Sequence, residues 1–245
     1  MSRLFFFLTG YLFFAASVCA QLSIHAGGSY LQSDNWDKTV QTYNLTTTWE
    51  AEEIKPLDYG WYAGAGYSIL LFNKPQVYLV PQIRYTHWGS QQGAMRLALH
   101  QLSIGPEIRF NPRALLFGIE SAGPIGPRWY MAAQPGLQCW MPRVKRNGAW
   151  TTYDSETPYR PLTARFDLKL STGFHAMTIG QWIVTPEMSA QLIKGTELFD
   201  WTEQILGHNI VGLNNTLNKG WNWSIGLVLT RMKKSTEWWD RPRAK

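Results

Sequence analysis

Leu162-Thr-Ala-Arg-Phe-Asp-Leu-Lys-Leu-Ser171 is the stretch that decides the fold. Every even-numbered side chain in it is apolar, and every odd-numbered one is polar or charged. Successive side chains of a β-strand point to opposite faces, so this period of two predicts a strand with one apolar and one polar face. About ten residues suffice to cross a bilayer as a tilted strand, whereas strands of soluble proteins usually have about five or six.

Seven further stretches repeat the pattern, over residues 22–32, 60–72, 77–86, 101–110, 128–141, 182–192 and 221–230. Together the eight predict an all-β fold, a single antiparallel transmembrane β-barrel of eight strands. Connections 34–59, 141–161 and 194–220 are long, while 73–76 and 176–181 are short. Long loops outside and short turns in the periplasm produce this alternation. Residues 111–127 break it, and they form either a periplasmic flap or two extra strands.

The composition excludes several other classes of protein. Charged residues make up 16% of the 245, against roughly 25% in an ordinary soluble domain. Aromatic residues make up 14%, too many for a disordered chain. After residue 20 no run approaches the roughly 18 apolar residues of a spanning helix. The net charge of +6 is not accompanied by a basic helix, so no nucleic-acid partner is expected.

The chain divides into three segments. Residues 1–20 read as a secretory signal peptide, with Arg3, a mostly apolar stretch, and a small-residue cleavage site ending at Ala20. Residues 21–232 are the predicted outer-membrane β-barrel. Residues 233–245 form a basic tail, which is expected in the periplasm. The exported chain then has one cysteine, Cys139, so it cannot form an internal disulfide.

Aromatic residues and prolines have particular positions in these strands. Tryptophans recur near the strand ends and predict an interfacial girdle; they are Trp61, Trp88, Trp129, Trp140, Trp182 and Trp221. Four prolines lie within strands on the apolar face: Pro81, Pro106, Pro135 and Pro186. Because proline lacks a backbone N–H, we expect bulges or locally broken pairing at these positions.

The polar faces carry seven charged side chains: Arg84, Glu107, Arg109, Arg165, Asp167, Lys169 and Glu187. An eight-stranded barrel is only wide enough inside for side chains, and unpaired buried charge is costly. We therefore predict an interior ion-pair network that plugs the lumen, with a charge-selective pore as the alternative. The five histidines are scattered, so neither a metal site nor a cofactor is predicted.

Several stretches resemble the Bacteroidota-type outer-membrane β-barrel family of PorT-like small barrels. They are the end of the signal peptide at Ala20-Gln21, the strand Leu102–Phe110, the strand Tyr130–Gln138 and the final strand Trp223–Arg231. The resemblance covers nearly all of the chain after residue 20. It implies an interaction or assembly component, accessory to a secretion or gliding apparatus.

Two other functions remain open. Ser23, His25 and Asp167 could form a nucleophile set in a lipid-modifying barrel, but access and geometry are not evident from sequence, and the prediction is that the protein is not an enzyme. A soluble secreted ligand-binding barrel would need the opposite orientation of its faces. The expected partners are outer-membrane lipid and a protein that binds through loops 34–59 and 194–220 or the tail 233–245. The second loop is apolar enough for a short amphipathic helix.

Overall fold

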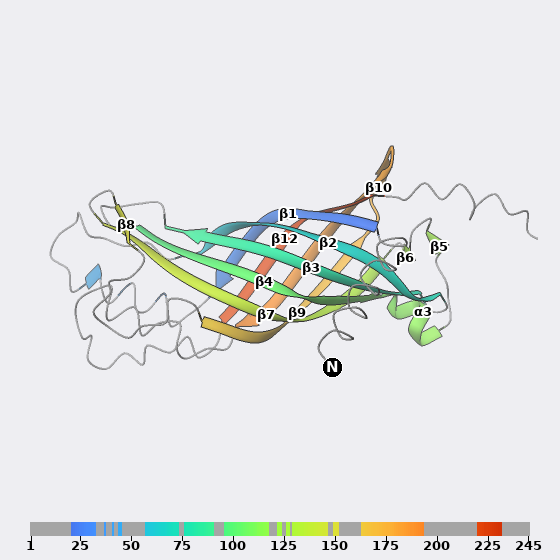
Figure 1. Ribbon diagram of the computed structural model, residues 1–245, viewed down its shortest axis with the longest axis horizontal. Helices are drawn as coiled ribbons and strands as arrows, with labels where there is room; N and C mark the ends of the chain where they lie inside the picture. The colour runs from blue at the N-terminus through green and yellow to red at the C-terminus, as the bar shows by residue number, and fades with distance from the viewer. Residues whose placement is uncertain are drawn as a thin grey trace, which may run out of the picture.

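A computed structural model describes residues 21–32, 37, 41, 44–45, 57–73, 76–90, 96–117, 122–123, 126–127, 129–146, 149–151, 163–193 and 220–231. Eight long strands form a barrel in it (Figure 1). They are β1 (Gln21–Gln32), β2 (Tyr59–Asn73), β3 (Gln76–Gly89), β4 (Arg96–Phe110), β7 (Trp129–Arg146), β9 (Thr163–Phe174), β11 (Trp182–Ile193) and β12 (Gly220–Arg231).

The strands follow one another around the barrel in the order β1, β2, β3, β4, β7, β9, β11 and β12. All pairs are antiparallel, and β12 pairs with β1 to close the circle. Each of the eight alternating stretches lies in one of these strands. The prediction of a closed, eight-stranded antiparallel barrel is therefore confirmed.

The two ends of the barrel differ in the connections that they carry (Figure 1). The turn end carries the helix α3 (Pro112–Phe117), the two-stranded hairpin of β5 (Ala122–Gly123) and β6 (Gly126–Pro127), and β10 (Met177–Ile179), which pairs with β11. The opposite end, here the loop end, carries β8 (Ala149–Thr151), which pairs with the extension of β7. Within the described part of 111–127, no segment pairs with the barrel, so these residues add no barrel strand.

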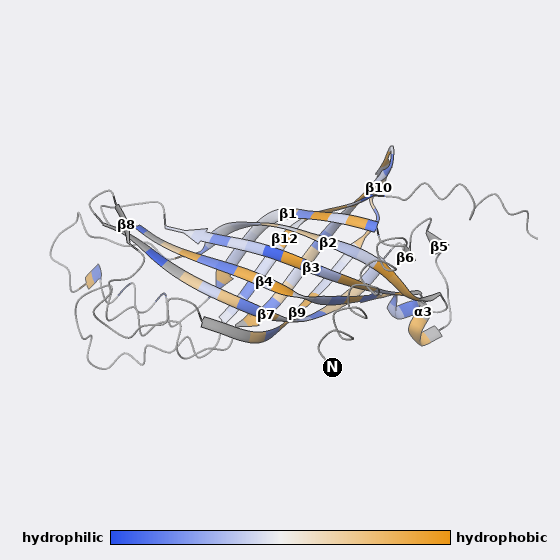
Figure 2. Cartoon of the chain, viewed as in Figure 1, coloured by the Kyte–Doolittle hydropathy of each residue, from blue (hydrophilic) through white to orange (hydrophobic). Residues whose placement is uncertain are grey.

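The period of two separates an apolar outer face from a polar inner face. On β9, Phe166 and Leu168 are 76% and 51% exposed, while Lys169 between Leu168 and Leu170 is buried. On β12, Asn222 and Ser224 are buried and Trp223 and Ile225 are exposed. Figure 2 shows the resulting stripes of hydrophobic and hydrophilic residues along the strands. This is the reverse of a soluble ligand-binding barrel, which places its apolar side chains inside.

The four prolines interrupt strand pairing as expected, and each does so on one side only. Pairing of β4 with β7 is missing between Ile104 and Ile108, where Pro106 faces Pro135, while Pro106 remains paired with Pro81 on the other side. An antiparallel residue directs both of its backbone polar groups toward the same neighbour, so a missing N–H weakens one ladder and spares the other. The register is unchanged across the gap at Pro81 and across the gap at Pro106 and Pro135, whereas beside Pro186 the pairing of β11 with β9 ends.

Several sequence predictions lie outside the described residues. They are the signal peptide 1–20, most of loop 34–59, the helix expected in 194–220 and the tail 233–245. None of the helices in the described part of the chain is long and apolar enough to cross a membrane.

Candidate functional site: the polar lumen

Glu107 is the centre of the hydrogen-bond network inside the barrel. Its side chain projects inward from β4 and is fully buried. Oε1 accepts a hydrogen bond from Nε of Arg109 at 2.5 Å, and Nζ of Lys169 lies 3.3 Å from Oε2. Nε2 of Gln82 donates to the same Oε2 at 2.7 Å. One carboxylate thus links side chains from β3, β4 and β9 across the lumen.

Glu187, on β11, provides a second buried carboxylate. The hydroxyl of Tyr130 donates to its Oε2 at 2.5 Å, and Nη2 of Arg109 lies 3.7 Å from the same oxygen. The Arg109 guanidinium also lies 4.9 Å from the centroid of the Tyr130 ring. Arg109 therefore stands between two carboxylates and an aromatic face, all of which stabilise its charge.

Arg84 is held without a carboxylate. Its guanidinium lies 3.6 Å from the centroid of the Tyr62 ring, and Nη2 donates to Ser224 Oγ at 2.6 Å. Gly226 provides the room for that ring, because a Cβ at this position would stand 2.4 Å from the Tyr62 hydroxyl. The glycine of this inner face therefore lets a large aromatic ring occupy the lumen.

A layer of amides crosses the lumen nearer the loop end. Gln191 donates to Oε1 of Gln138 at 2.5 Å, and Gln101 donates to the same oxygen. Asn222 donates to Gln191 at 3.4 Å and accepts from the Ser29 hydroxyl at 2.7 Å. These side chains come from β1, β4, β7, β11 and β12, so the layer crosses the barrel interior and links strands that are not neighbours.

Trp88 and Trp140 stack inside the lumen beyond this layer, so the predicted girdle is wrong for these two residues. Both side chains are buried, at 0% and 1% exposure, and their rings stack with centroids 5.7 Å apart at an interplanar angle of 11°. The parity of their strands explains the placement, since Trp88 shares a face with Arg84 and Trp140 with Gln138. Trp61, Trp129 and Trp221 are exposed outside, at 50%, 40% and 42%, and Trp182 is half-buried.

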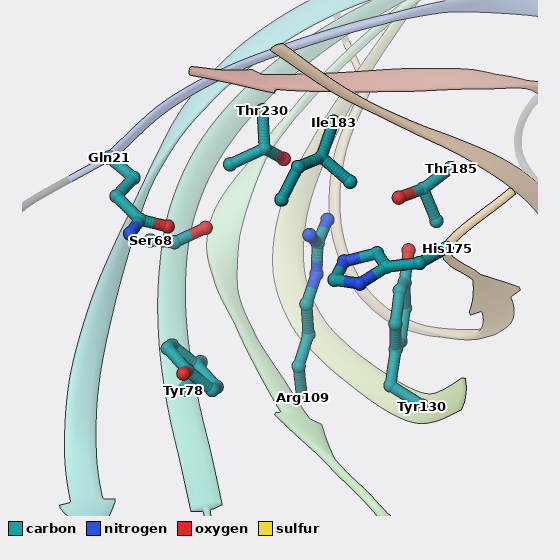
Figure 3. Close-up of a pocket in the computed structure, with 9 residues that line it drawn as sticks. All are labelled: Gln21, Ser68, Tyr78, Arg109, Tyr130, His175, Ile183, Thr185 and Thr230. Carbon is teal, nitrogen blue, oxygen red and sulfur yellow. The ribbon is translucent and has the colours of Figure 1, made fainter. Parts of the chain in front are cut away.

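A small cavity of about 40 Å³ remains inside the turn end (Figure 3). Figure 3 shows Arg109, Tyr130 and His175 around it, with Thr185 and Thr230 nearby. A buried water needs roughly 10–15 Å³ of such space, so the cavity holds a few waters at most. Described side chains fill the lumen above it through Glu107, Arg84, the amides and the two tryptophans.

The remaining candidates are placed less centrally. Asp167 is half-buried on β9, and the Arg165 side chain lies outside the described residues. Ser23 Oγ and His25 Nε2 are 3.3 Å apart, and both residues are buried in the lumen at 0% and 2% exposure. Of the three residues imagined as a nucleophile set, the structure brings Ser23 and His25 into contact, at positions closed to solvent.

The amide layer of the lumen was not predicted, because the prediction of an interior network rested on charged side chains alone. The period of two indicates their inward position, because Gln82 shares a face with Arg84, and Gln138 shares one with Gln134. The described residues hold no cluster of three or more His, Cys, Asp or Glu suited to a metal ion.

The outer face has a hollow of about 590 Å³. Gly28 and Ala190 are small residues lining it, among the larger side chains of Tyr30, Trp223 and Met188. A Cβ on Gly28 would meet nothing within 4 Å, so the space above it is open. The lining is almost wholly apolar and suits a hydrocarbon chain.

Three solved structures are similar to the barrel. Neisserial surface protein A has 9% identity and a TM-score of 0.46, with 87% of this chain and 97% of that chain covered. Ail of Yersinia pestis, in complex with the heparin analogue sucrose octasulfate, has 10% identity and a TM-score of 0.40, with 86% and 97% covered. Outer membrane protein OprG from Pseudomonas aeruginosa has 12% identity and a TM-score of 0.38, with 88% and 97% covered. The strand pairing, not these likenesses, establishes the fold.

No protein-family model matches the sequence, and no curated protein matches it. The assignment to the PorT-like barrels stays a prediction.

Proposed function

We propose that this protein is an outer-membrane β-barrel whose own side chains plug its lumen, and that it acts as an interaction or assembly component. The observation that carries the proposal is the network around Glu107 and Arg84, which joins side chains across the barrel interior. A barrel filled in this way offers surfaces to partners, and not a path to solutes.

The outer face supports a membrane location. Large apolar side chains are exposed on every barrel strand, Phe166 at 76% and Ile225 at 62% among them. An apolar surface this large is rare on soluble monomers. A closed barrel satisfies its backbone groups internally, as the hydrocarbon layer requires. With long loops outside, the loop end faces the cell exterior and the turn end faces the periplasm.

Exposed apolar side chains at the turn end suit a protein partner. Leu116 of α3 is 71% exposed, and Ile179 of β10 is 61% exposed. A place beside a secretion or gliding apparatus is one form of this role, and it rests on the PorT-like resemblance alone. No catalytic role is proposed, because Ser23 and His25 are sealed in the lumen.

The test combines fractionation with affinity isolation. The tagged protein should sediment with outer membrane, and after detergent extraction it should retain a stoichiometric protein partner. Leu116→Ser combined with Ile179→Ser should reduce that recovery without changing heat-modifiable migration on gels. Recovery in the soluble periplasm would overturn the location. Failure to retain any partner beyond those of an unrelated barrel would overturn the interaction role.

A further inference from the structure

Four polar side chains gather on the lipid-facing side of β3, β4 and β7. They are Tyr85, His87, His100 and Arg143, here called the outer basic cluster. The rings of His87 and His100 have centroids 4.8 Å apart, and the Tyr85 hydroxyl is hydrogen-bonded to His100 Nδ1. Arg143 lies on the neighbouring strand β7, two residues from Met141, which pairs with His100.

The outer basic cluster lies near the loop end of the barrel. His87 is two residues before the end of β3, His100 is four after the start of β4, and Arg143 is three before the end of β7. Arg96, four residues before His100 on the same outer face of β4, is exposed. Trp61 contacts the cluster, with its ring centroid 5.8 Å from that of His87. Tryptophan prefers the membrane–water interface.

Two nitrogens of the cluster lack hydrogen-bond partners within the described part of the protein. Among the described residues, His87 Nδ1 and Arg143 Nε have none, and Nη2 of Arg143 reaches only the Met141 sulfur at 3.7 Å. No acidic residue lies on the outward strand positions whose side chains are described. Unpartnered polar groups are expensive in hydrocarbon, so these donors belong at the depth of the lipid head groups.

We propose that the outer basic cluster binds a phosphate group of an outer-leaflet glycolipid. The Arg143 guanidinium supplies charge-assisted donors for phosphate oxygens, and imidazole N–H groups beside it supply neutral donors. Apolar side chains flank the cluster on the same face, Ile83 at 46% and Leu102 at 37% exposure, and suit the acyl chains of the same molecule. A ligand with phosphates and acyl chains fits both features, whereas free phosphate fits only the first. The inference rests on the orientation in the proposed function.

The experiment measures binding of lipopolysaccharide to the purified barrel in a zwitterionic detergent. His100→Ala with Arg143→Ala should weaken binding about tenfold, since at least one charge-assisted contact is lost. Arg231→Ala is the matched control, because Arg231 is an exposed cation on the outer face of β12 at the turn end. It should bind like wild type. Heat-modifiable migration confirms that each variant is folded.

Two further ligands identify the source of the phosphate. Chemically dephosphorylated lipopolysaccharide should bind the wild type as weakly as intact lipopolysaccharide binds the double variant. Inorganic phosphate at millimolar concentration should not displace the lipid. Equal binding by all variants, equal binding of the dephosphorylated lipid, or displacement by phosphate would each overturn the proposal. A wild-type barrel that fractionates with outer membrane yet gives one of these results refutes only this site, whereas a soluble barrel refutes the proposed function.

Discussion

Glu107 and Glu187 neutralise unequal shares of the buried positive charge. Glu107 contacts both Arg109 and Lys169, whereas Glu187 is 3.7 Å from Arg109 alone and accepts its closer hydrogen bond from the neutral Tyr130. Removing one partner of a buried ion pair leaves the other charge uncompensated, and the cost is larger than the pair itself contributes. The two carboxylates should therefore differ in their importance for stability.

Glu107→Gln should lower the free energy of unfolding by roughly 3–5 kcal/mol. Glu187→Gln keeps an acceptor for Tyr130 and should cost less. Urea titration of the barrel folded in lipid vesicles measures both. Equal losses of unfolding free energy for the two variants would mean that Glu107 does not neutralise more of the buried positive charge than Glu187 does.

Gly173 tests how tightly the lumen is packed. A Cβ at this position would stand 2.7 Å from the Tyr130 hydroxyl and the ring carbon that bears it. Tyr130 is held by Glu187, so it cannot move away without losing that hydrogen bond. Gly173→Ala should destabilise the barrel by about 1–3 kcal/mol, as overpacked substitutions do. In Tyr130→Leu the same change should cost clearly less, and additive effects in this double-mutant cycle would contradict the contact.

The elements show where sequence patterns succeed and where they fail. The alternation predicted every barrel strand, but β4 begins at Arg96 and β7 continues to Arg146, each about five residues beyond the predicted limits. At this end the faces change character: Leu99 and Trp140 are buried, while His100 lies on the outside. The pattern of apolar outer and polar inner residues therefore ends before the strands do, and the predicted strands are too short at this end.

Strand β9 allows its two faces to be tested separately. Leu168 is 51% exposed on the outer face, and Asp167 beside it is half-buried on the opposite face. Leu168→Arg places a charge toward lipid. It should lower the free energy of unfolding by roughly 2–4 kcal/mol if the position is near the bilayer midplane. Asp167→Asn should leave the folded fraction in vesicles largely intact. A larger loss of folded protein for Asp167→Asn than for Leu168→Arg would mean that the inner and outer faces are reversed.

For the whole molecule, the parity of the strands predicted five charged residues that are buried in the lumen, but not which of them meet: Arg84, Glu107, Arg109, Lys169 and Glu187. Contacts such as Glu107 with Lys169 depend on how far each strand slides past its neighbour around the barrel, and no local pattern encodes that sum. The girdle prediction is wrong for Trp88 and Trp140 for a related reason. Both lie near strand ends, but the parity of their strands turns them inward.

Ion conductance tests the plugged lumen most directly. The purified, heat-modifiable barrel is inserted in a planar lipid bilayer, and current is recorded under an applied voltage, with an open porin as the positive control. The side chains around Glu107 and Arg84, below the stacked pair of Trp88 and Trp140, predict no steady single-channel current. A stable conductance that scales with salt concentration and admits small solutes would contradict the plug and restore the charge-selective pore.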